Sequence, residues 1–252
     1  DYVQVVPAPI STMVRDGLAE FGLDNKSALR CKNMFTLGLV CWLFDRPLDH
    51  AMTMLQTKFA KKPDIAKANI KALTDGYNYG NNIHASVSTY RIEGSKQAPG
   101  IYKDVSGNNA TSYGLIAAAE KAGLQLFLGS YPITPATDIL HELSKHKNLG
   151  VTTVQAEDEI AGICTAIGAS FAGCLSATST SGPGLALKSE AIGLAVIAEL
   201  PLVIIDVQRG GPSTGMPTKS EQTDLMQALY GRNGESPLVV VAATTPTDCF
   251  DM

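Results

Sequence analysis

The sequence predicts an α/β fold with a parallel sheet, preceded by a mainly helical segment. From residue 104 onward, short apolar runs alternate with segments of helical character, as buried parallel strands alternate with helices. Apolar residues make up 45% of the 252-residue chain, which is enough to bury a sizeable core. The chain also has 23 glycines and only 6% aromatic residues, a composition that suits closely packed α/β layers.

Residues 1–85 are predicted to be helical and to form the first domain. Ser27 is a candidate N-cap for a helix that the Arg46-Pro47 pair would end. A second helix is expected over residues 48–58, and a third begins near Pro63, a residue suited to the first helical turn. Nothing in this segment has the spacing of a catalytic motif.

Residues 86–103 are polar, contain glycine and proline, and lack periodicity, so we predict a linker. Residues 104–252 would form the second domain. Its strands are expected at residues 124–128, 151–154, 175–178, 202–207 and 238–242. Its helices are expected at residues 109–121, 135–145, 156–172, 185–198 and 225–229. The chain begins with Asp1, and residues 246–252 begin a further helix, so we expect a fragment of a longer polypeptide.

Composition argues against several function classes. The net charge is −4 and no basic stripe is present, which disfavours nucleic-acid binding. Glu199 and Pro201 interrupt the most apolar stretch, so no membrane span is predicted. Five scattered cysteines without a CxxC pair indicate reduced thiols, a cytoplasmic location and no iron–sulfur cluster held by this chain. Cys164 and Cys174 lie in apolar segments and are expected in the core.

A first candidate site follows the strand expected at residues 124–128. Residues 129–135 read GSYPITP, in which two prolines bracket Thr134. Because ligands bind at the carboxyl ends of parallel strands, the rigid turn would hold this hydroxyl in a crevice. The alternative is that Thr134 only caps the following helix.

A second candidate is the acidic sequence QAEDE at residues 155–159, which opens a helix rich in alanine and glycine. Acidic residues in a first helical turn are favoured by the helix dipole, so surface capping explains them without any function. The small residues, however, allow this helix to pack closely on another element. A carboxylate buried at its start could share a proton with a ligand nitrogen. Spacing alone does not decide which acid that is.

A third candidate is the loop at residues 206–215, DVQRGGPSTG, which follows an apolar strand. Arg209 is placed to bind a carboxylate in bidentate fashion, unless it is an ordinary arginine of a surface loop. The sequence TSTSGPG at residues 178–184 resembles a phosphate-binding loop only weakly, because it lacks the lysine of a P-loop.

Taken together, the stretches YPITP, QAEDEIAGICTAIGAS, TSTSGPG and VQRGGPSTGMPTKSEQTD resemble, in this order, the alpha subunit of 2-oxoacid:ferredoxin oxidoreductases. The resemblance covers residues 104–252 and implies the pyrimidine-binding domain of a thiamine diphosphate enzyme. Residues 1–85, with KNMFTLGLVCWLFDRP and KANIKALTDGYNYG, are similar to the end of the family's gamma module, fused ahead of the alpha part as in 2-oxoglutarate-type enzymes.

The resemblance assigns roles to individual residues. Glu157 stands five positions before Gly162, the spacing common in related enzymes, and would hydrogen-bond the pyrimidine nitrogen N1′. Glu159 is the alternative for this role. Thr134 and Arg209 match residues that contact the 2-oxoacid, and Arg209 would pair with its carboxylate. Tyr131 and Pro132 would line the pyrimidine pocket.

The resemblance also implies cofactors and partners. Thiamine diphosphate would be shared with a beta subunit that carries Mg²⁺ and the [4Fe-4S] cluster, in an α2β2 assembly active only as a complex. The implied reaction is the coenzyme A-dependent oxidative decarboxylation of a 2-oxoacid, foremost 2-oxoglutarate, with reduction of ferredoxin. The alternatives are a pyruvate- or branched-chain-type oxidoreductase, a carboligase, a non-catalytic assembly subunit and, least favoured, a plain nucleotide-binding domain.

Overall fold

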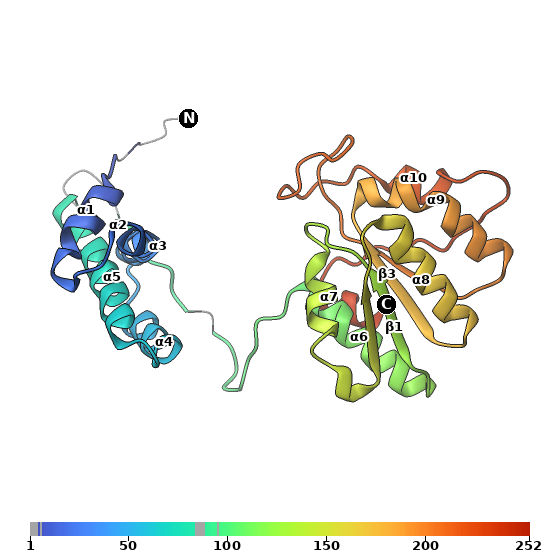
Figure 1. Cartoon of the computed structure of the whole chain (residues 1–252), viewed down its shortest axis with the longest axis horizontal. Helices are drawn as coiled ribbons and strands as arrows, with labels where there is room; N and C mark the ends of the chain where they lie inside the picture. The colour runs from blue at the N-terminus through green and yellow to red at the C-terminus, as the bar shows by residue number, and fades with distance from the viewer. Residues whose placement is uncertain (1–4, 6, 84–88, 95) are drawn as a thin grey trace. The chain divides into compact units, whose positions relative to one another are not determined.

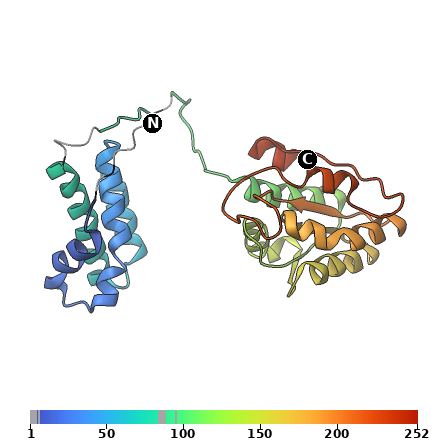
Figure 2. The same ribbon diagram turned by 90° about the horizontal axis from the view of Figure 1, so that it is seen from above.

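The computed structural model describes residues 5, 7–83, 89–94 and 96–252 (Figures 1 and 2). The chain divides into two compact units, residues 1–100 and 101–252. The predicted linker at residues 86–103 lies partly outside the described residues. Its described positions contain no helix or strand.

The first unit is helical, as predicted. Its longest helices, α3 and α5, touch through glycine: a Cβ on Gly38 would overlap the carbonyl of Leu73, and one on Gly76 would overlap that of Phe35. Such a close approach requires a residue without a side chain. The elements are α1 (Ile10–Gly17), η1 (Ala19–Phe21), α2 (Asn25–Leu29), α3 (Lys32–Leu43), α4 (Asp49–Lys58) and α5 (Pro63–Ile83).

The prediction that Ser27 is the N-cap of a long helix in the first unit was wrong. Asp24, not Ser27, is the N-cap residue, and its carboxylate accepts a hydrogen bond from the Ser27 backbone N–H at 2.8 Å. Ser27 lies inside the short helix α2, and the long helix α3 begins only at Lys32. An ionised carboxylate satisfies the free N–H groups of a first turn more strongly than a neutral hydroxyl does.

The second unit contains the predicted parallel sheet, with strand order β2-β1-β3-β4. The core on one face joins α6 and α7 to β1, and the core on the other face joins α8 and α9 (Figure 1). The elements are α6 (Gly107–Ala122), β1 (Leu126–Ser130), α7 (Thr137–Leu143), η3 (Lys147–Leu149), β2 (Val151–Gln155), α8 (Glu159–Phe171), β3 (Leu175–Thr180), α9 (Gly182–Ile197), β4 (Val203–Asp206), α10 (Leu225–Tyr230) and α11 (Pro246–Asp251).

Helix α8 packs closely on β1, which confirms the prediction from its small residues. A Cβ on Gly129 in β1 would overlap both the hydroxyl of Thr165 and the carbonyl of Gly162. Ala166, on the same side of α8, is completely buried. The start of α8 is therefore held tightly beside the end of β1.

Three local predictions for the second unit were wrong. Residues 238–242 form no strand: Val239 is 92% exposed, and a strand needs a neighbour to pair its backbone groups. The helix expected from Pro135 begins at Thr137, since Pro135 lies in the preceding turn. Neither Cys164 nor Cys174 is a core residue: Cys164 is exposed on the outer side of α8, and Cys174 is only partly buried.

Candidate functional site

The candidate site lies at the carboxyl ends of the four strands. The strand pairing places Ser130 beside Gln155 and Thr180 beside Asp206, so these ends share one edge of the sheet. The order β2-β1-β3-β4 makes the boundary between β1 and β3 the point where the chain changes direction across the sheet. Ligands of open α/β sheets bind in the crevice outside such a point.

Tyr131, the first residue after β1, lies at this boundary and is 4% exposed. Its hydroxyl is hydrogen-bonded to Thr180 Oγ1 at the end of β3, at 3.0 Å. A Cβ on Gly184 would overlap both hydroxyl oxygens, which explains a glycine in the first turn of α9. Burial raises the pKa of Tyr131 well above its usual range, although Thr180 and Arg209 act in the opposite direction.

Lys188, which sequence reasoning did not single out, lies next to Tyr131 and is completely buried. Its ammonium donates to the carbonyl of Glu159 at 2.9 Å and to Thr178 Oγ1 at 3.0 Å, and it lies 5.1 Å from the centre of the Tyr131 ring. The signal was present: Lys188 is three residues after Leu185 and four before Ile192, on the buried side of α9.

Arg209 and Thr134, predicted to face one crevice, are in direct contact. Arg209 Nη1 donates to the Thr134 carbonyl at 2.7 Å, and Nη2 donates to the Thr214 carbonyl at the same distance. Arg209 is 4% exposed, which rules out the ordinary surface arginine. The Thr134 side chain is exposed and does not cap α7, whose first turn has no side-chain cap.

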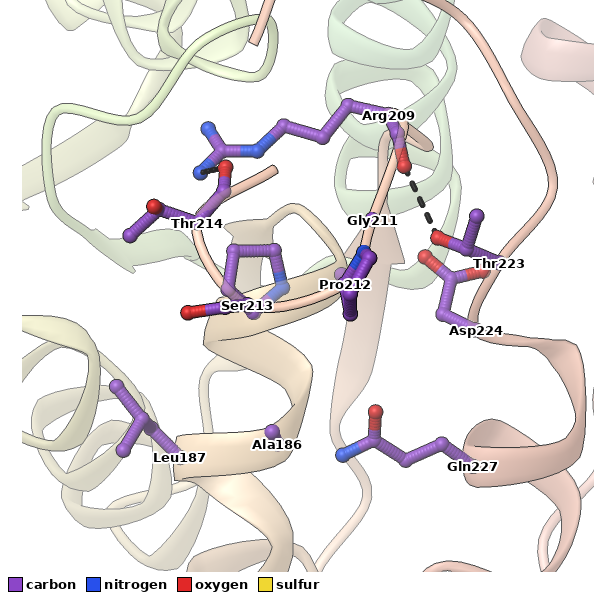
Figure 3. Close-up of a pocket in the computed structure, with 12 residues that line it drawn as sticks. Ala186, Leu187, Arg209, Gly211, Pro212, Ser213, Thr214, Thr223, Asp224 and Gln227 are labelled. Carbon is purple, nitrogen blue, oxygen red and sulfur yellow. Dashed lines mark hydrogen bonds between the residues drawn. The ribbon is translucent and has the colours of Figure 1, made fainter. Parts of the chain in front are cut away.

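Two further hydrogen bonds join the loop that carries Arg209 to residues 223 and 224. Thr223 Oγ1 donates to the Arg209 carbonyl at 3.0 Å, and Gln208 Nε2 donates to Asp224 Oδ1 at 3.3 Å. This loop and the start of α9 border a cleft of about 460 Å³ (Figure 3). It is lined by Gly182, Pro183, Ala186, Leu187, Arg209, Gly211, Pro212, Ser213, Thr214, Thr223, Asp224 and Gln227.

Asp206, the last residue of β4, adds a protonated carboxyl to this region. Burial, together with the neighbouring Asp224 carboxyl, raises the pKa of Asp206 to about 8. Two adjacent buried carboxyls are stable when they share a proton, since two negative charges at that separation repel. Asp206 is therefore mainly neutral at pH 7.

The acidic sequence at the start of α8 divides its three carboxylates between different environments. Asp158 is the N-cap residue and accepts from the Ala161 N–H at 2.8 Å. Glu159, the first helical residue, is partly buried next to Tyr131 and Lys188. Glu157 precedes the helix and its side chain is exposed, as is that of Pro132.

The described part of the chain has neither a metal-binding cluster nor a membrane-spanning helix. No group of three or more His, Cys, Asp or Glu side chains there could hold a metal ion. Across the same residues, no helix combines the length and apolarity needed to cross a bilayer.

A parallel sheet covered by helices on both faces, in which the chain changes direction between β1 and β3, defines a ligand-binding domain of the doubly wound α/β class. Residues 117–252 match the family model "Pyruvate flavodoxin/ferredoxin oxidoreductase, thiamine diP-bdg". The chain belongs to this family, and its second unit is a thiamine diphosphate-binding domain.

Individual relatives agree with this assignment. The chain is 56% identical over 251 residues to the 2-oxoglutarate oxidoreductase subunit KorA of Mycobacterium tuberculosis, covering all of this chain and 38% of that protein. It is 46% identical over 147 residues to the 2-oxoglutarate synthase subunit KorA of Archaeoglobus fulgidus, covering 58% of this chain and 41% of that protein.

A solved structure is similar over nearly the whole chain. It is the 2-oxoglutarate:ferredoxin oxidoreductase from Magnetococcus marinus with 2-oxoglutarate, coenzyme A and succinyl-CoA bound. Its TM-score is 0.73 at 37% identity, and the match covers 97% of this chain and 40% of that one. The chain therefore spans about two fifths of the length of these relatives.

Proposed function

We propose that this chain is part of the alpha subunit of a 2-oxoglutarate:ferredoxin oxidoreductase, which oxidatively decarboxylates 2-oxoglutarate with coenzyme A and reduces ferredoxin. The observation that carries the proposal is the contact of Arg209 with the Thr134 turn, at the crevice beside the start of α8. The 2-oxoglutarate named for the relatives and for the solved structure supports the choice of substrate.

In this proposal, Glu157 holds the proton at pyrimidine nitrogen N1′, and Tyr131 and Pro132 line the pyrimidine pocket. The residues present suit such a ring. Gly184 lets the Tyr131 hydroxyl lie directly against α9, and Ser181 Oγ, just before that helix, is buried without a partner among the described residues. Thiamine diphosphate, when bound, supplies the electron sink for decarboxylation. An exposed Glu157 can reach a cofactor shared with a second chain.

Arg209 would bind the carboxylate of the 2-oxoacid while Thr134 contacts the same substrate. A guanidinium has five N–H donors. The Thr134 and Thr214 carbonyls each hold one donor, which fixes the orientation of the group. Nε has no partner among the described residues, so donors remain for a carboxylate.

The proposed partner is a beta subunit that binds the diphosphate, Mg²⁺ and a [4Fe-4S] cluster, in an α2β2 assembly in the cytoplasm. Helices α8 and α9 carry exposed apolar side chains that suit a protein interface, among them Phe171, 83% exposed, and Ile197, 82% exposed. We assign residues 1–85 to the end of the gamma domain, 86–103 to a linker and 104–252 to the pyrimidine-binding domain. The solved structure, which matches both units, supports this division.

The test is coenzyme A-dependent reduction of a viologen dye by the full-length protein co-expressed with its beta partner. The account predicts rapid reduction with 2-oxoglutarate and at least about tenfold lower kcat/KM with pyruvate or a branched-chain 2-oxoacid. Activity on pyruvate alone would agree with the proposed mechanism but contradict 2-oxoglutarate as the substrate. If thiamine diphosphate is bound but no 2-oxoacid is oxidised, the chain is a non-catalytic assembly subunit.

A further inference from the structure

Lys188 is buried in a place where a positive charge is unfavourable. Its side chain is completely buried in α9, and no carboxylate lies within 4 Å of its ammonium among the residues described. Its bond to the Glu159 carbonyl places the ammonium beside the first turn of α8. The helix dipole favours negative charge there, and lysine is rarely buried without a partner of opposite charge. Local rules are most often broken at functional sites.

The contacts of Lys188 join three elements that build the crevice. The ammonium holds Thr178 of β3 at 3.0 Å and the first turn of α8 through the Glu159 carbonyl at 2.9 Å. It also lies 5.1 Å from the Tyr131 ring centre, a distance at which a cation is attracted to an aromatic face. An apolar side chain of the same length could fill the space but could make none of these three interactions.

We propose that Lys188 is a positioning residue of the cofactor site, whose ammonium fixes Tyr131 and the first turn of α8 and so orients Glu157 toward the pyrimidine ring. Resting on the function proposed above, this inference adds a residue that does not touch the cofactor itself. It makes cofactor affinity depend on the charge of a side chain behind the crevice.

The charge of Lys188 is set to change near physiological pH. Burial lowers the pKa of Lys188 to about 8, despite the opposing effect of Glu159 and Asp158 at the start of α8 and of Cys164 further along that helix. Among the described residues, the phenol of Tyr131 is a further titratable group beside the ammonium. Deprotonation would weaken both hydrogen bonds and remove the attraction to the ring. If only the protonated form holds the site correctly, affinity falls as pH rises through 8.

The experiment is calorimetric titration of thiamine diphosphate with Mg²⁺ into the full-length protein and its beta partner, between pH 6.5 and 9.5. For one proton with a pKa near 8, the wild-type Kd should rise about tenfold from pH 7 to pH 9. Lys188→Met, of similar length but uncharged, should weaken binding about tenfold at pH 7 and show no such rise. Lys121→Met, which changes an exposed lysine of α6, should match the wild type.

A second variant separates positioning from general damage to the fold. Thr178→Val keeps the shape of the side chain but removes one acceptor of the ammonium, so it should shift the loss of affinity to lower pH. A Lys188→Met protein that binds like the wild type, or keeps the rise in Kd, overturns the inference and leaves the proposed function intact. If Asp206→Asn abolishes the rise and Lys188→Met does not, the titrating group is that carboxyl and the inference fails. Wild-type protein that binds no thiamine diphosphate contradicts the proposed function as well.

Discussion

Arg209 Nη1 donates to the backbone carbonyl of Thr134 at 2.7 Å, joining two loops that are 75 residues apart in the chain. The loops follow β1 and β4, which are separated in the sheet by β3, so this contact joins loops from strands that are not neighbours. The two residues proposed to contact the 2-oxoacid are therefore held together before any ligand binds. Such preorganisation lowers the entropic cost of binding in the correct geometry.

The first prediction concerns this contact. Arg209→Lys cannot hold the Thr134 and Thr214 carbonyls with one planar group. It should lower the free energy of unfolding by about 1–3 kcal/mol and raise the KM for 2-oxoglutarate at least about tenfold. Denaturant unfolding and steady-state kinetics measure the two effects.

Arg232→Lys is the matched control, because Arg232 also donates to backbone carbonyls, at Ala228, Leu229 and Ser236. It should reduce stability by a similar amount and leave the KM unchanged. An equal rise in KM for both variants would mean that Arg209 acts through stability alone.

The second prediction concerns Gly184 in the first turn of α9. A methyl group there would overlap the hydroxyls of Tyr131 and Thr180, so Gly184→Ala should displace the tyrosine and weaken thiamine diphosphate binding at least about tenfold. Gly193→Ala, in the same helix but in open space, should leave binding unchanged and stabilise the protein by about 0.5–1 kcal/mol. If Gly184→Ala binds thiamine diphosphate with unchanged affinity, Tyr131 does not line the pyrimidine pocket.

The third prediction concerns Asp206. Because burial raises its pKa from 3.8 to about 8, the folded protein keeps a proton that the unfolded chain releases. This contribution to stability is fully present below pH 3.8 and is lost as the pH rises to 8. Asp206→Asn should therefore gain stability relative to the wild type between pH 5 and pH 8, by at least about 1.4 kcal/mol.

Thermal unfolding at a series of pH values checks this behaviour. Asp138→Asn, at an exposed position in α7, serves as the control and should follow the wild-type curve. Parallel curves for Asp206→Asn and the wild type would show that Asp206 is ionised in the folded protein.

Much of the fold could be predicted because parallel strands buried on both faces read as apolar runs. The strands β1 to β4 were found in this way, whereas the close packing of α8 was predicted from its alanine and glycine residues. The apolar run at residues 238–242 led to a wrong strand prediction, because an apolar run forms a strand only when a neighbouring strand is available to pair with it. Local pattern carries no information about that neighbour.

The site was predicted less completely, because its contacts are not local. Because ligands bind at the carboxyl ends of parallel strands, Thr134 and Arg209 were predicted to face one crevice. Nothing in their spacing predicted that the guanidinium would bind the Thr134 carbonyl. Lys188 was overlooked because a lysine in a helix is usually exposed. Its position on the buried side of α9, in line with Leu185 and Ile192, was the signal that could have identified it.

The most direct test of the central claim compares Glu157→Gln with Glu159→Gln in coenzyme A-dependent oxidation of 2-oxoglutarate by the assembled enzyme. Both changes remove one charge and keep the shape of the side chain. If Glu157 holds the proton at the pyrimidine ring, Glu157→Gln should lower kcat about 10²–10⁴-fold, while Glu159→Gln retains activity within a few-fold. The opposite pattern would move the role to Glu159, and full activity in both variants would contradict the account of this site.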